Sequence, residues 1–374
     1  MARRKYRAAV IGAGFIGSGY HVPAYLSQAE RCELVAIADA VPGKAEYVAK
    51  RNGIQNVYTD PYQMLREMQP DVVSVCVPNN DHKKMAIAAL EAGANVICEK
   101  PMTMTLADAK EMYAVADRVG RILTPCQNDR FGYRQIVHDM VQDGLLGDVY
   151  FGECESVRRR GIPNWGVFHM KEYNSGGPFC DIGVHFIDSM MYILGNPRFE
   201  AAFAKTWAKI APQERDEVNT SRVDQSSTFI PRPYRNEEFS VEDHAAGSLR
   251  FAGDLMLNFK FSWALNTRPS DGFRLHGTRA GLIFDKMDKD MFRLYSNIGK
   301  TQVDSILRID PVHRFRNIEN PGIWLLIDQF LNALDGTEEF IIKREEVLNV
   351  CAVIEAVYKS AELNREVTMG EIEG

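Results

Sequence analysis

The feature that most constrains the fold is a glycine-rich turn between an apolar strand and a helix. Residues 6–11 form a short apolar run, and Gly12, Gly14 and Gly17 follow in the spacing G-x-G-x-x-G. Here Gly12 allows a tight turn, Gly14 leaves room for a pyrophosphate, and Gly17 lets the helix pack closely on the strand. Backbone N–H groups at the start of that helix attract phosphate. The turn predicts a dinucleotide-binding unit.

A carboxylate at the end of the next strand indicates which dinucleotide is bound. Asp39 follows the apolar run 34–38, where it can accept hydrogen bonds from both hydroxyls of a ribose. The next three residues, Ala-Val-Pro, include no arginine or serine that could hold a 2′-phosphate, and Asp39 would repel one. We therefore expect NAD, with NADP less favoured, although Lys44 and Arg51 lie near enough in sequence to soften that preference.

Strand-like and helix-like segments alternate through the first 125 residues. The expected helices cover 43–52, 61–68, 81–92 and 106–119, and the expected strands cover 6–11, 34–38, 72–77, 95–98 and 121–125. Alternation at these lengths predicts an α/β domain at residues 1–125, with the doubly wound parallel sheet of a Rossmann fold.

From Cys126 onward the pattern changes to longer alternating strands joined by turns. The expected strands are 148–158, 246–251, 255–264, 273–276, 282–285 and 291–295, and the expected helices are 135–142, 182–194, 324–334 and 345–363. This predicts an α+β domain at residues 126–374 with a large, mainly antiparallel sheet. The stretch 213–242 is polar and contains several prolines, so we expect a long loop that lines a pocket.

Composition and charge exclude several classes of partner. A chain of 374 residues with a net charge of −6 gives no electrostatic reason to expect nucleic acid or an anionic membrane. No apolar run is long enough to span a bilayer, and the basic start is followed by a strand rather than a signal peptide. Seven cysteines are spread singly, which is typical of buried thiols in a reducing compartment and argues against zinc. We expect a cytoplasmic protein without a bound metal that acts on small molecules.

Unusual polar residues follow two of the expected parallel strands. One strand is followed by Pro78-Asn79-Asn80-Asp81-His82, and the next by Glu99-Lys100-Pro101. Ligands of open parallel sheets bind at the carboxyl ends of the strands, so both segments belong on the cofactor side. Glu99 and Lys100 could instead be an ordinary surface ion pair. Pro101 restricts Lys100 to an extended conformation, which favours a side chain directed at the nicotinamide pocket.

A predicted helix after Gly176 and Gly177 carries three polar residues on one face. Asp181, His185 and Asp188 recur at positions i, i+4 and i+7. Judged by residues alone, such a helix is more often a satisfied polar network than an active site. Two carboxylates and an imidazole also leave a metal site as an alternative.

Taken together, these motifs resemble the Gfo/Idh/MocA family, the relatives of glucose-fructose oxidoreductase and inositol dehydrogenase. The resemblance spans most of the chain and rests on the glycine motif, on Val77-Pro78-Asn79 with His82, on 93–101 and on 175–188. It implies a Rossmann domain followed by a second domain whose open sheet face forms dimers or tetramers. We therefore expect a homo-oligomer.

The resemblance implies that Lys100, Asp181 and His185 are catalytic. Removing a hydride from a secondary alcohol leaves a carbonyl if a base also takes the hydroxyl proton, and we assign that base to His185. Lys100, as a cation, would stabilise the developing alkoxide and lower the pKa of His185. Asp181 would orient the substrate over the nicotinamide. Asp188, one turn further along, is assigned a structural role.

The resemblance also implies a wider set of contacts. The expected cofactor-binding residues are Gly12, Gly14, Phe15, Ile16, Gly17, Asp39, Pro78, Asn79, His82, Glu99, Lys100 and Asn128. The expected substrate-binding residues are Lys100, Arg130, Arg159, Trp165, Asp181 and His185. Trp165 could offer an apolar platform to a sugar ring, although a tryptophan is more often part of a core and arginines are often solvated.

These residues predict an NAD-dependent dehydrogenase that oxidises a ring hydroxyl of a sugar, glycoside or inositol, or reduces the keto form. The resemblance alone favours C3 of a glucose-like unit. One alternative is a glycosidase that recycles NAD through transient oxidation at C3, which the missing secretion signal disfavours. The other is a non-catalytic sensor of NAD and sugar, which the presence of all three chemical residues disfavours.

Overall fold

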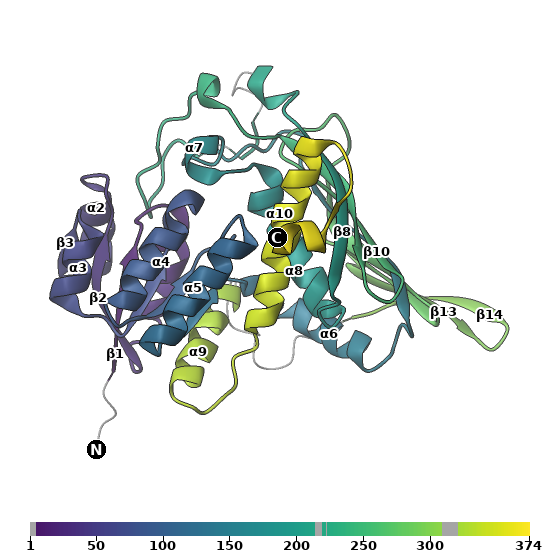
Figure 1. The fold of residues 1–374 in the computed structure, drawn as a ribbon, viewed down its shortest axis with the longest axis horizontal. Helices are drawn as coiled ribbons and strands as arrows, with labels where there is room; N and C mark the ends of the chain where they lie inside the picture. The colour runs from purple at the N-terminus through teal and green to yellow at the C-terminus, as the bar shows by residue number, and fades with distance from the viewer. Residues whose placement is uncertain (1–4, 214–218, 222, 309–320) are drawn as a thin grey trace.

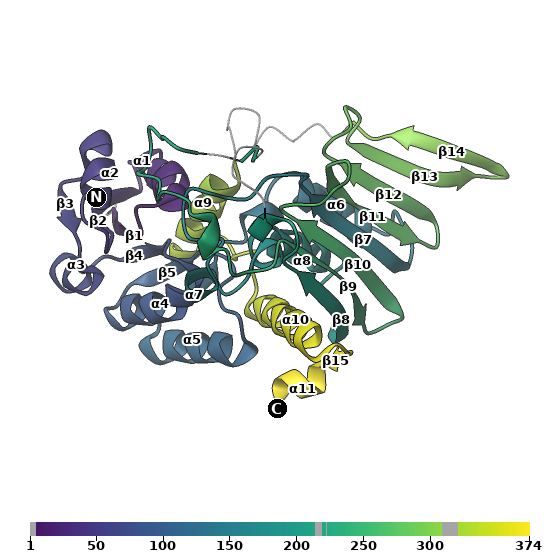
Figure 2. The same ribbon diagram turned by 90° about the horizontal axis from the view of Figure 1, so that it is seen from above.

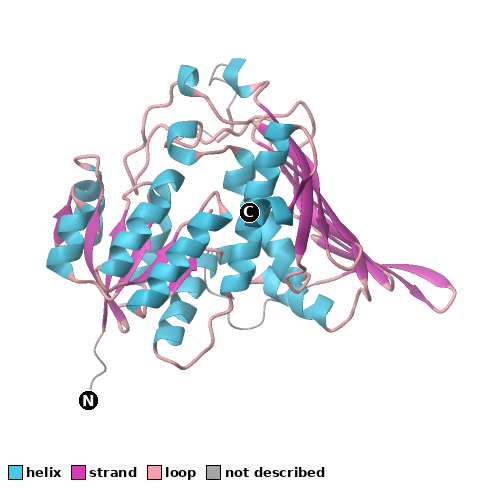
Figure 3. Cartoon of the chain, viewed as in Figure 1, coloured by secondary structure: helices cyan, strands magenta, loops and turns pink. Residues whose placement is uncertain are grey.

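Two β-sheets organise the chain, one in each half of the molecule (Figure 1). The structure is a computed structural model that describes residues 5–213, 219–221, 223–308 and 321–374. The first sheet has six strands and the second has nine, with helices packed between the two sheets (Figure 3). Within the described ranges, none of the helices combines the length and apolar character needed to cross a bilayer.

The first sheet is entirely parallel and has the strand order β3-β2-β1-β4-β5-β6. Its strands are β1 (Tyr6–Ile11), β2 (Cys32–Ala38), β3 (Asn56–Tyr58), β4 (Val72–Val75), β5 (Asn95–Cys98) and β6 (Leu123–Pro125). Its helices are α1 (Val22–Leu26), α2 (Lys44–Asn52), α3 (Pro61–Met68), α4 (His82–Glu91) and α5 (Leu106–Val119). This order confirms the predicted Rossmann fold. The three-residue edge strand β3 was not predicted, because so short a segment shows no periodicity.

One helix from the end of the chain completes the core of the first sheet. Helix α9 (Pro321–Leu334) buries Ile323, Leu326 and Phe330 in the same apolar cluster as the β1 side chains. The hydroxyl of Tyr6 also donates a hydrogen bond of 2.6 Å to Asp335, just after α9. The division at residue 125 stays a prediction, and α9 departs from it because it lies in the 126–374 range but packs on the first sheet.

The second sheet has the order β14-β13-β12-β11-β7-β10-β9-β8-β15, and its pairs are antiparallel except that of β7 with β10. Its first strands are β7 (Val149–Val157), β8 (Phe199–Trp207), β9 (His244–Phe251), β10 (Leu255–Ser262) and β11 (Ser270–Gly277). The others are β12 (Ala280–Asp285), β13 (Phe292–Ile298), β14 (Thr301–Ile306) and β15 (Val367–Thr368). The predicted mainly antiparallel sheet is thereby confirmed.

Helices cover one face of this sheet, the face toward the first domain (Figures 1 and 2). They are α8 (Val184–Ile193), α10 (Arg344–Leu363) and, packed on α8, α6 (Tyr133–Gln142), while the short α11 (Met369–Glu373) ends the chain. Among the described elements, no helix lies on the opposite face, which we call the open face.

A long loop of the second domain reaches the glycine-rich turn of the first. The described part of the expected 213–242 loop contains one short 3₁₀ turn and no strand, while residues 214–218 and 222 lie outside the described ranges. We call residues 223–241 the strap. Phe229 in the strap is 3% exposed and packs edge-on against Phe15, with 5.7 Å between the ring centres. Tyr47 on α2 donates a 3.0 Å hydrogen bond to the carbonyl of Ser226.

Candidate active site

Lys100, Asp181 and His185 meet at the carboxyl end of β5. Lys100 is the second residue after that strand, and its amine donates hydrogen bonds to the backbone oxygen of Asp181 at 2.7 Å and to Oδ1 at 3.3 Å. Asp181 lies in a π-helical turn (Phe179–Gly183), and His185 lies in the first turn of α8. The indole N–H of Trp263, the residue after β10 of the second sheet, donates to the other Asp181 oxygen at 3.0 Å. The structure thus brings together the three residues expected to be catalytic.

The glycine pair before this turn allows a close approach that no other residue would permit. A Cβ on Gly176 would lie 2.1 Å from the Tyr358 hydroxyl, and one on Gly177 would lie 2.0 Å from the backbone oxygen of Glu242. Tyr358 in turn donates a 2.8 Å hydrogen bond to the Glu242 side chain. The π-helical turn therefore packs against a buried polar contact between α10 and the loop that leads into β9.

The charges of the site keep its histidine neutral and its carboxylate ionised at neutral pH. Burial and the Lys100 ammonium lower the pKa of His185 to about 4, against the opposing effect of nearby carboxylates. Burial would raise the pKa of Asp181, but the charges of Lys100 and Arg158 hold it below its usual value. At pH 7 the imidazole can accept a proton, and the lysine and aspartate form an ion pair.

Other charged residues line the site, and they were not among the predicted site residues. Asp129 Oδ2 lies 3.6 Å from His185 Nδ1 and 3.1 Å from an Arg134 nitrogen. Arg158 acts on Asp181 through its charge. Burial raises the pKa of Asp271 on β11, against the opposing charges of Lys286 and the two arginines. Asp129 and Arg158 are chain neighbours of predicted site residues, which was an available signal. Asp271 gave no signal in the sequence.

A buried chain of hydrogen-bonded side chains starts at Glu99, the residue before Lys100. Glu99 Oε1 lies 2.9 Å from His21 Nε2, His21 Nδ1 lies 2.9 Å from the Ser74 hydroxyl, and Ser74 lies 2.8 Å from the Tyr25 hydroxyl. Burial would raise the pKa of Glu99, but the hydrogen bond and charge of His21, together with the Lys100 charge, lower it to about 2. Glu99 also accepts a 3.1 Å hydrogen bond from the backbone N–H of Lys100.

The glycine-rich turn has the shape that a dinucleotide requires. Gly12 has a φ of +109°, and a Cβ there would lie 2.3 Å from the Cys76 oxygen, while a Cβ on Gly17 would lie 2.1 Å from the Gly12 oxygen. A Cβ on Gly14 would meet no described atom within 4 Å, so this position is open to a pyrophosphate. Asp39 accepts hydrogen bonds from the backbone N–H groups of Ala13 at 2.8 Å and of Val41 at 2.9 Å, which fixes its carboxylate beside the turn. The residues present therefore fit NAD.

The remaining expected cofactor residues fall into two groups. Phe15, Ile16, Pro78, Asn79 and Asn128 are half-buried around the same edge of the sheet, and the Asn79 amide donates a 2.9 Å hydrogen bond to the carbonyl of Asn174 in the second domain. Their cofactor contacts stay predictions.

His82 and Glu99 instead support the loops from inside. His82 is 1% exposed, and its ring nitrogens lie 2.8 Å from the Pro101 oxygen and 2.9 Å from the Val77 oxygen. Glu99 is turned toward His21. The expected direct cofactor contacts of His82 and Glu99 are wrong in this structure, because both side chains are buried behind the loops.

Arg130 requires a larger correction. Its side chain is fully buried, with hydrogen bonds of 2.9 and 2.5 Å to the two oxygens of Asp188 and a further ion pair with Glu346. It therefore joins the turn after β6 to α8 and α10, and the expected substrate contact is wrong. The same pairing confirms the structural role assigned to Asp188 and removes it from any metal site with Asp181 and His185.

The two remaining substrate predictions are not decided by the geometry. Arg159 is exposed, and its neighbour Arg158 is the arginine whose charge reaches Asp181. Trp165 is half-buried and packs on Phe15 with 5.2 Å between ring centres, and its indole N–H has no hydrogen-bond partner among the described residues.

Comparison with known proteins agrees with this geometry. Residues 6–126 match the model of the oxidoreductase family, NAD-binding Rossmann fold, and residues 138–369 match its C-terminal alpha/beta domain. The chain is 31% identical to the D-glucoside 3-dehydrogenase of Escherichia coli K12, over 99% of both proteins. It is 25% identical to the levoglucosan dehydrogenase of Pseudarthrobacter phenanthrenivorans, over 75% of this chain and 74% of that protein.

Solved structures show the same fold. A levoglucosan dehydrogenase in complex with NADH and levoglucosan superposes with a TM-score of 0.80 at 21% identity, over 98% of this chain and 100% of that one. The family matches together cover both sheets and the residues Lys100, Asp181 and His185. This chain therefore belongs to the Gfo/Idh/MocA family and is an NAD-dependent oxidoreductase that acts on CH–OH groups.

Proposed function

We propose that this protein is an NAD-dependent sugar dehydrogenase that oxidises the C3 hydroxyl of a glucoside, or reduces the 3-keto form. The observation that carries the proposal is the similarity over 99% of both chains to a D-glucoside 3-dehydrogenase, in a protein whose Lys100, Asp181 and His185 converge at one point. Relatives named as inositol and levoglucosan dehydrogenases support a cyclic polyol as the substrate class.

The residues of the site suit oxidation of a secondary alcohol. Bound NAD would supply the hydride acceptor. His185, neutral at pH 7, can take the hydroxyl proton, and the Lys100 ammonium can stabilise the oxygen as its negative charge develops. Asp181 is held from two sides, by Lys100 and Trp263, so it can accept a hydrogen bond from the reacting or a neighbouring hydroxyl without moving.

The charges around the site favour an uncharged substrate with many hydroxyls. The cations Lys100, Arg134, Arg158 and Lys286 lie close to three carboxyl groups, those of Asp129, Asp181 and Asp271. A phosphorylated or acidic sugar would meet these carboxyl groups as well as the cations. A neutral polyol can donate hydrogen bonds to the carboxylates and accept them from the cations.

The decisive experiment combines a 340 nm assay with a labelled substrate. Purified protein and NAD are offered methyl glucosides, free hexoses and inositols, and each product is identified by NMR. Methyl glucoside carrying deuterium at C3 should show a primary isotope effect and transfer the label to NADH, whereas deuterium at C2 or C4 should do neither.

Three results would contradict the proposal. Label transfer from C2 or C4 would remove the assignment to C3. Release of the aglycone from an aryl glucoside without net NADH would indicate the glycosidase alternative instead. No reduction of NAD with any member of the panel, despite binding of NAD and sugar, would indicate a sensor.

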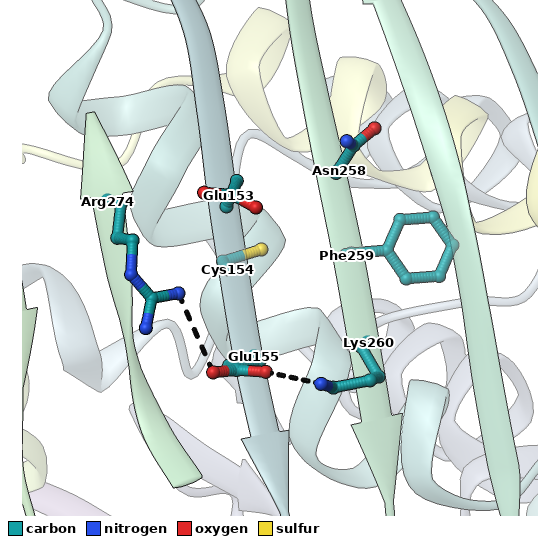
Figure 4. Close-up of a pocket in the computed structure, with 7 residues that line it drawn as sticks. All are labelled: Glu153, Cys154, Glu155, Asn258, Phe259, Lys260 and Arg274. Carbon is teal, nitrogen blue, oxygen red and sulfur yellow. Dashed lines mark ion pairs between the residues drawn. The ribbon is translucent and has the colours of Figure 1, made fainter. Parts of the chain in front are cut away.

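We also propose that the open face of the second sheet joins subunits. Large apolar side chains are exposed there, with Phe203 56%, Met256 42% and Tyr295 38% exposed. On the same face, Glu155 pairs with Lys260 at 2.7 Å and with Arg274 at 3.6 Å, the two ion pairs that are dashed in Figure 4. Light scattering should give the mass of a dimer or tetramer for the wild type and that of a monomer for Phe203→Glu; a monomeric wild type would refute this.

A further inference from the structure

The Nδ1 nitrogen of His185 faces the carboxylate of Asp129, which has no role in the oxidation as proposed above. Nδ1 is buried, has no hydrogen-bond partner among the described residues, and lies 3.6 Å from Oδ2 of Asp129. The two side chains are 23% and 26% exposed, so both border the same site. A hydrogen bond between them would need roughly 2.7–3.2 Å, and contacts in a catalytic site often shorten to that length only when substrate binds.

The position of Asp129 relative to His185 is fixed by the neighbours of both residues. Asp129 lies in the 3₁₀ turn Asn128–Arg130 after β6, and the next residue, Arg130, forms the buried pair with Asp188. Asp188 lies one helical turn after His185 on α8. The turn and the helix are therefore joined beside the Asp129–His185 contact. Arg134, at 3.1 Å from Asp129, holds the carboxylate from its other side.

We propose that Asp129 is a positioning residue for His185: it accepts the Nδ1 hydrogen, which leaves the lone pair of Nε2 to take the substrate hydroxyl proton. This inference rests on the proposed dehydrogenase function. In the oxidation, the O–H proton moves to Nε2 and the C–H hydrogen leaves as hydride to NAD. The O–H electron pair becomes the second bond of the carbonyl. The imidazolium formed is stabilised by the Asp129 carboxylate until it releases its proton.

The surrounding charges explain why the histidine needs such a partner. His185 faces the cations Lys100 and Arg134 and the carboxylates Asp129 and Asp181. The cations and burial hold its pKa at about 4, which makes it a weak base at neutral pH. Asp129 opposes them, and it is itself ionised, because the charge of Arg134 keeps the pKa of Asp129 below its usual value despite burial. Removing the Asp129 charge therefore makes the imidazolium harder to form.

The first test compares Asp129→Asn with the control Asp139→Asn. Asp139 on α6 also faces a histidine, His138 at 3.0 Å, but its side chain is 66% exposed, and neither residue has been placed in the site. Asp129→Asn should lower kcat roughly 10- to 100-fold with the KM for sugar and the Kd for NAD changed less than about threefold. Asp129→Glu should recover part of the rate. Asp139→Asn should match the wild type.

The second test asks whether the two residues act as a unit. In a His185→Gln background, whose residual rate is followed at high pH, Asp129→Asn should cause little further loss. An equal loss in both backgrounds would overturn the proposal. So would a raised KM with kcat intact, which would make Asp129 a substrate contact, or full activity of Asp129→Asn.

A third test needs no substrate, so it separates failure of this inference from failure of the proposed function. NMR of protein labelled with ¹⁵N-histidine reports which ring nitrogen carries the hydrogen at pH 7. The wild type should carry it on Nδ1 of His185, and Asp129→Asn should shift the population toward Nε2. A wild-type His185 with its hydrogen on Nε2 would overturn the inference even in an active dehydrogenase. A wild type that oxidises no sugar would refute only the proposed function.

Discussion

Replacing Arg130 with methionine distinguishes a buried structural arginine from a substrate contact. The substitution keeps the length of the side chain but removes a guanidinium that is 0% exposed and paired with Asp188 and Glu346. Breaking one side of a buried ion pair costs about 3–5 kcal/mol, because the Asp188 carboxylate stays buried without its counter-charge. We therefore expect Arg130→Met to lower stability far more than it changes substrate binding.

The expected shift in melting temperature follows from the size of the protein. An unfolding entropy of about 2.1 cal/mol/K per residue gives roughly 0.8 kcal/mol/K for a chain of 374 residues that unfolds as one unit. A loss of about 3–5 kcal/mol then lowers Tm by roughly 4–6 °C. Calorimetry measures this shift, and the 340 nm assay at 25 °C gives KM on the fraction that remains folded.

A second variant shows whether the loss comes from uncompensated charge. In Arg130→Met/Asp188→Leu the most deeply buried carboxylate is also removed, so part of the lost Tm should return. An unchanged Tm in Arg130→Met, together with a KM raised more than about tenfold, would refute the reasoning and restore Arg130 as a substrate contact.

Three further predictions concern the cofactor, the catalytic lysine and pH. Asp39→Ala should weaken NAD binding about tenfold and raise the ratio of NADP to NAD turnover. Calorimetric titration measures the NAD affinity, and an unchanged affinity would contradict this prediction. Lys100→Met should lower kcat roughly 10²–10³-fold while NAD still binds, and near-normal kcat would exclude it from the reaction. Glu99 has a folded pKa of about 2 against an ordinary 4.5, so its contribution to stability, about 3 kcal/mol, is present above pH 4.5 and is lost as pH falls toward 2. The Tm advantage of the wild type over Glu99→Gln should therefore shrink across that range, and a constant difference from pH 7 to pH 3 would contradict it.

The sequence predicts most of the two sheets because their strands follow simple patterns. The buried strands β1 and β4 are short apolar runs, and the glycine spacing predicts the turn between β1 and the next helix. Strand β8 was not predicted, because its sequence Phe-Glu-Ala-Ala-Phe-Ala is rich in alanine and its polar and apolar residues do not alternate clearly. Its faces are defined by its pairing with β9 and β15 and by the helix α10 that packs on it.

The site residues that stand in sequence motifs could be predicted, whereas those whose role depends on a partner far away in the sequence could not. Lys100 and His185 stand in recognisable motifs, but the sequence alone gives no sign that Arg130 turns inward to Asp188, fifty-eight positions away. Asp129, its neighbour, faces the site instead. Asp129 and Arg130 point to opposite sides of one short turn. Such a turn has no periodicity that would predict which residue points to which side.

The return of α9 to the first sheet bears on how the protein is made. On the ribosome, residues 6–126 emerge well before the helix that covers Tyr6 and the adjoining strands. Nearly 200 residues separate β6 from α9, which at about 5–20 residues per second leaves the first core uncovered for roughly 10–40 s. During that interval the apolar surface that later packs against Leu326, Ile327 and Phe330 is exposed to solvent. Nascent chains halted before residue 321 should therefore bind chaperones that recognise apolar segments, and chains in which residues 321–335 have left the ribosome should be released.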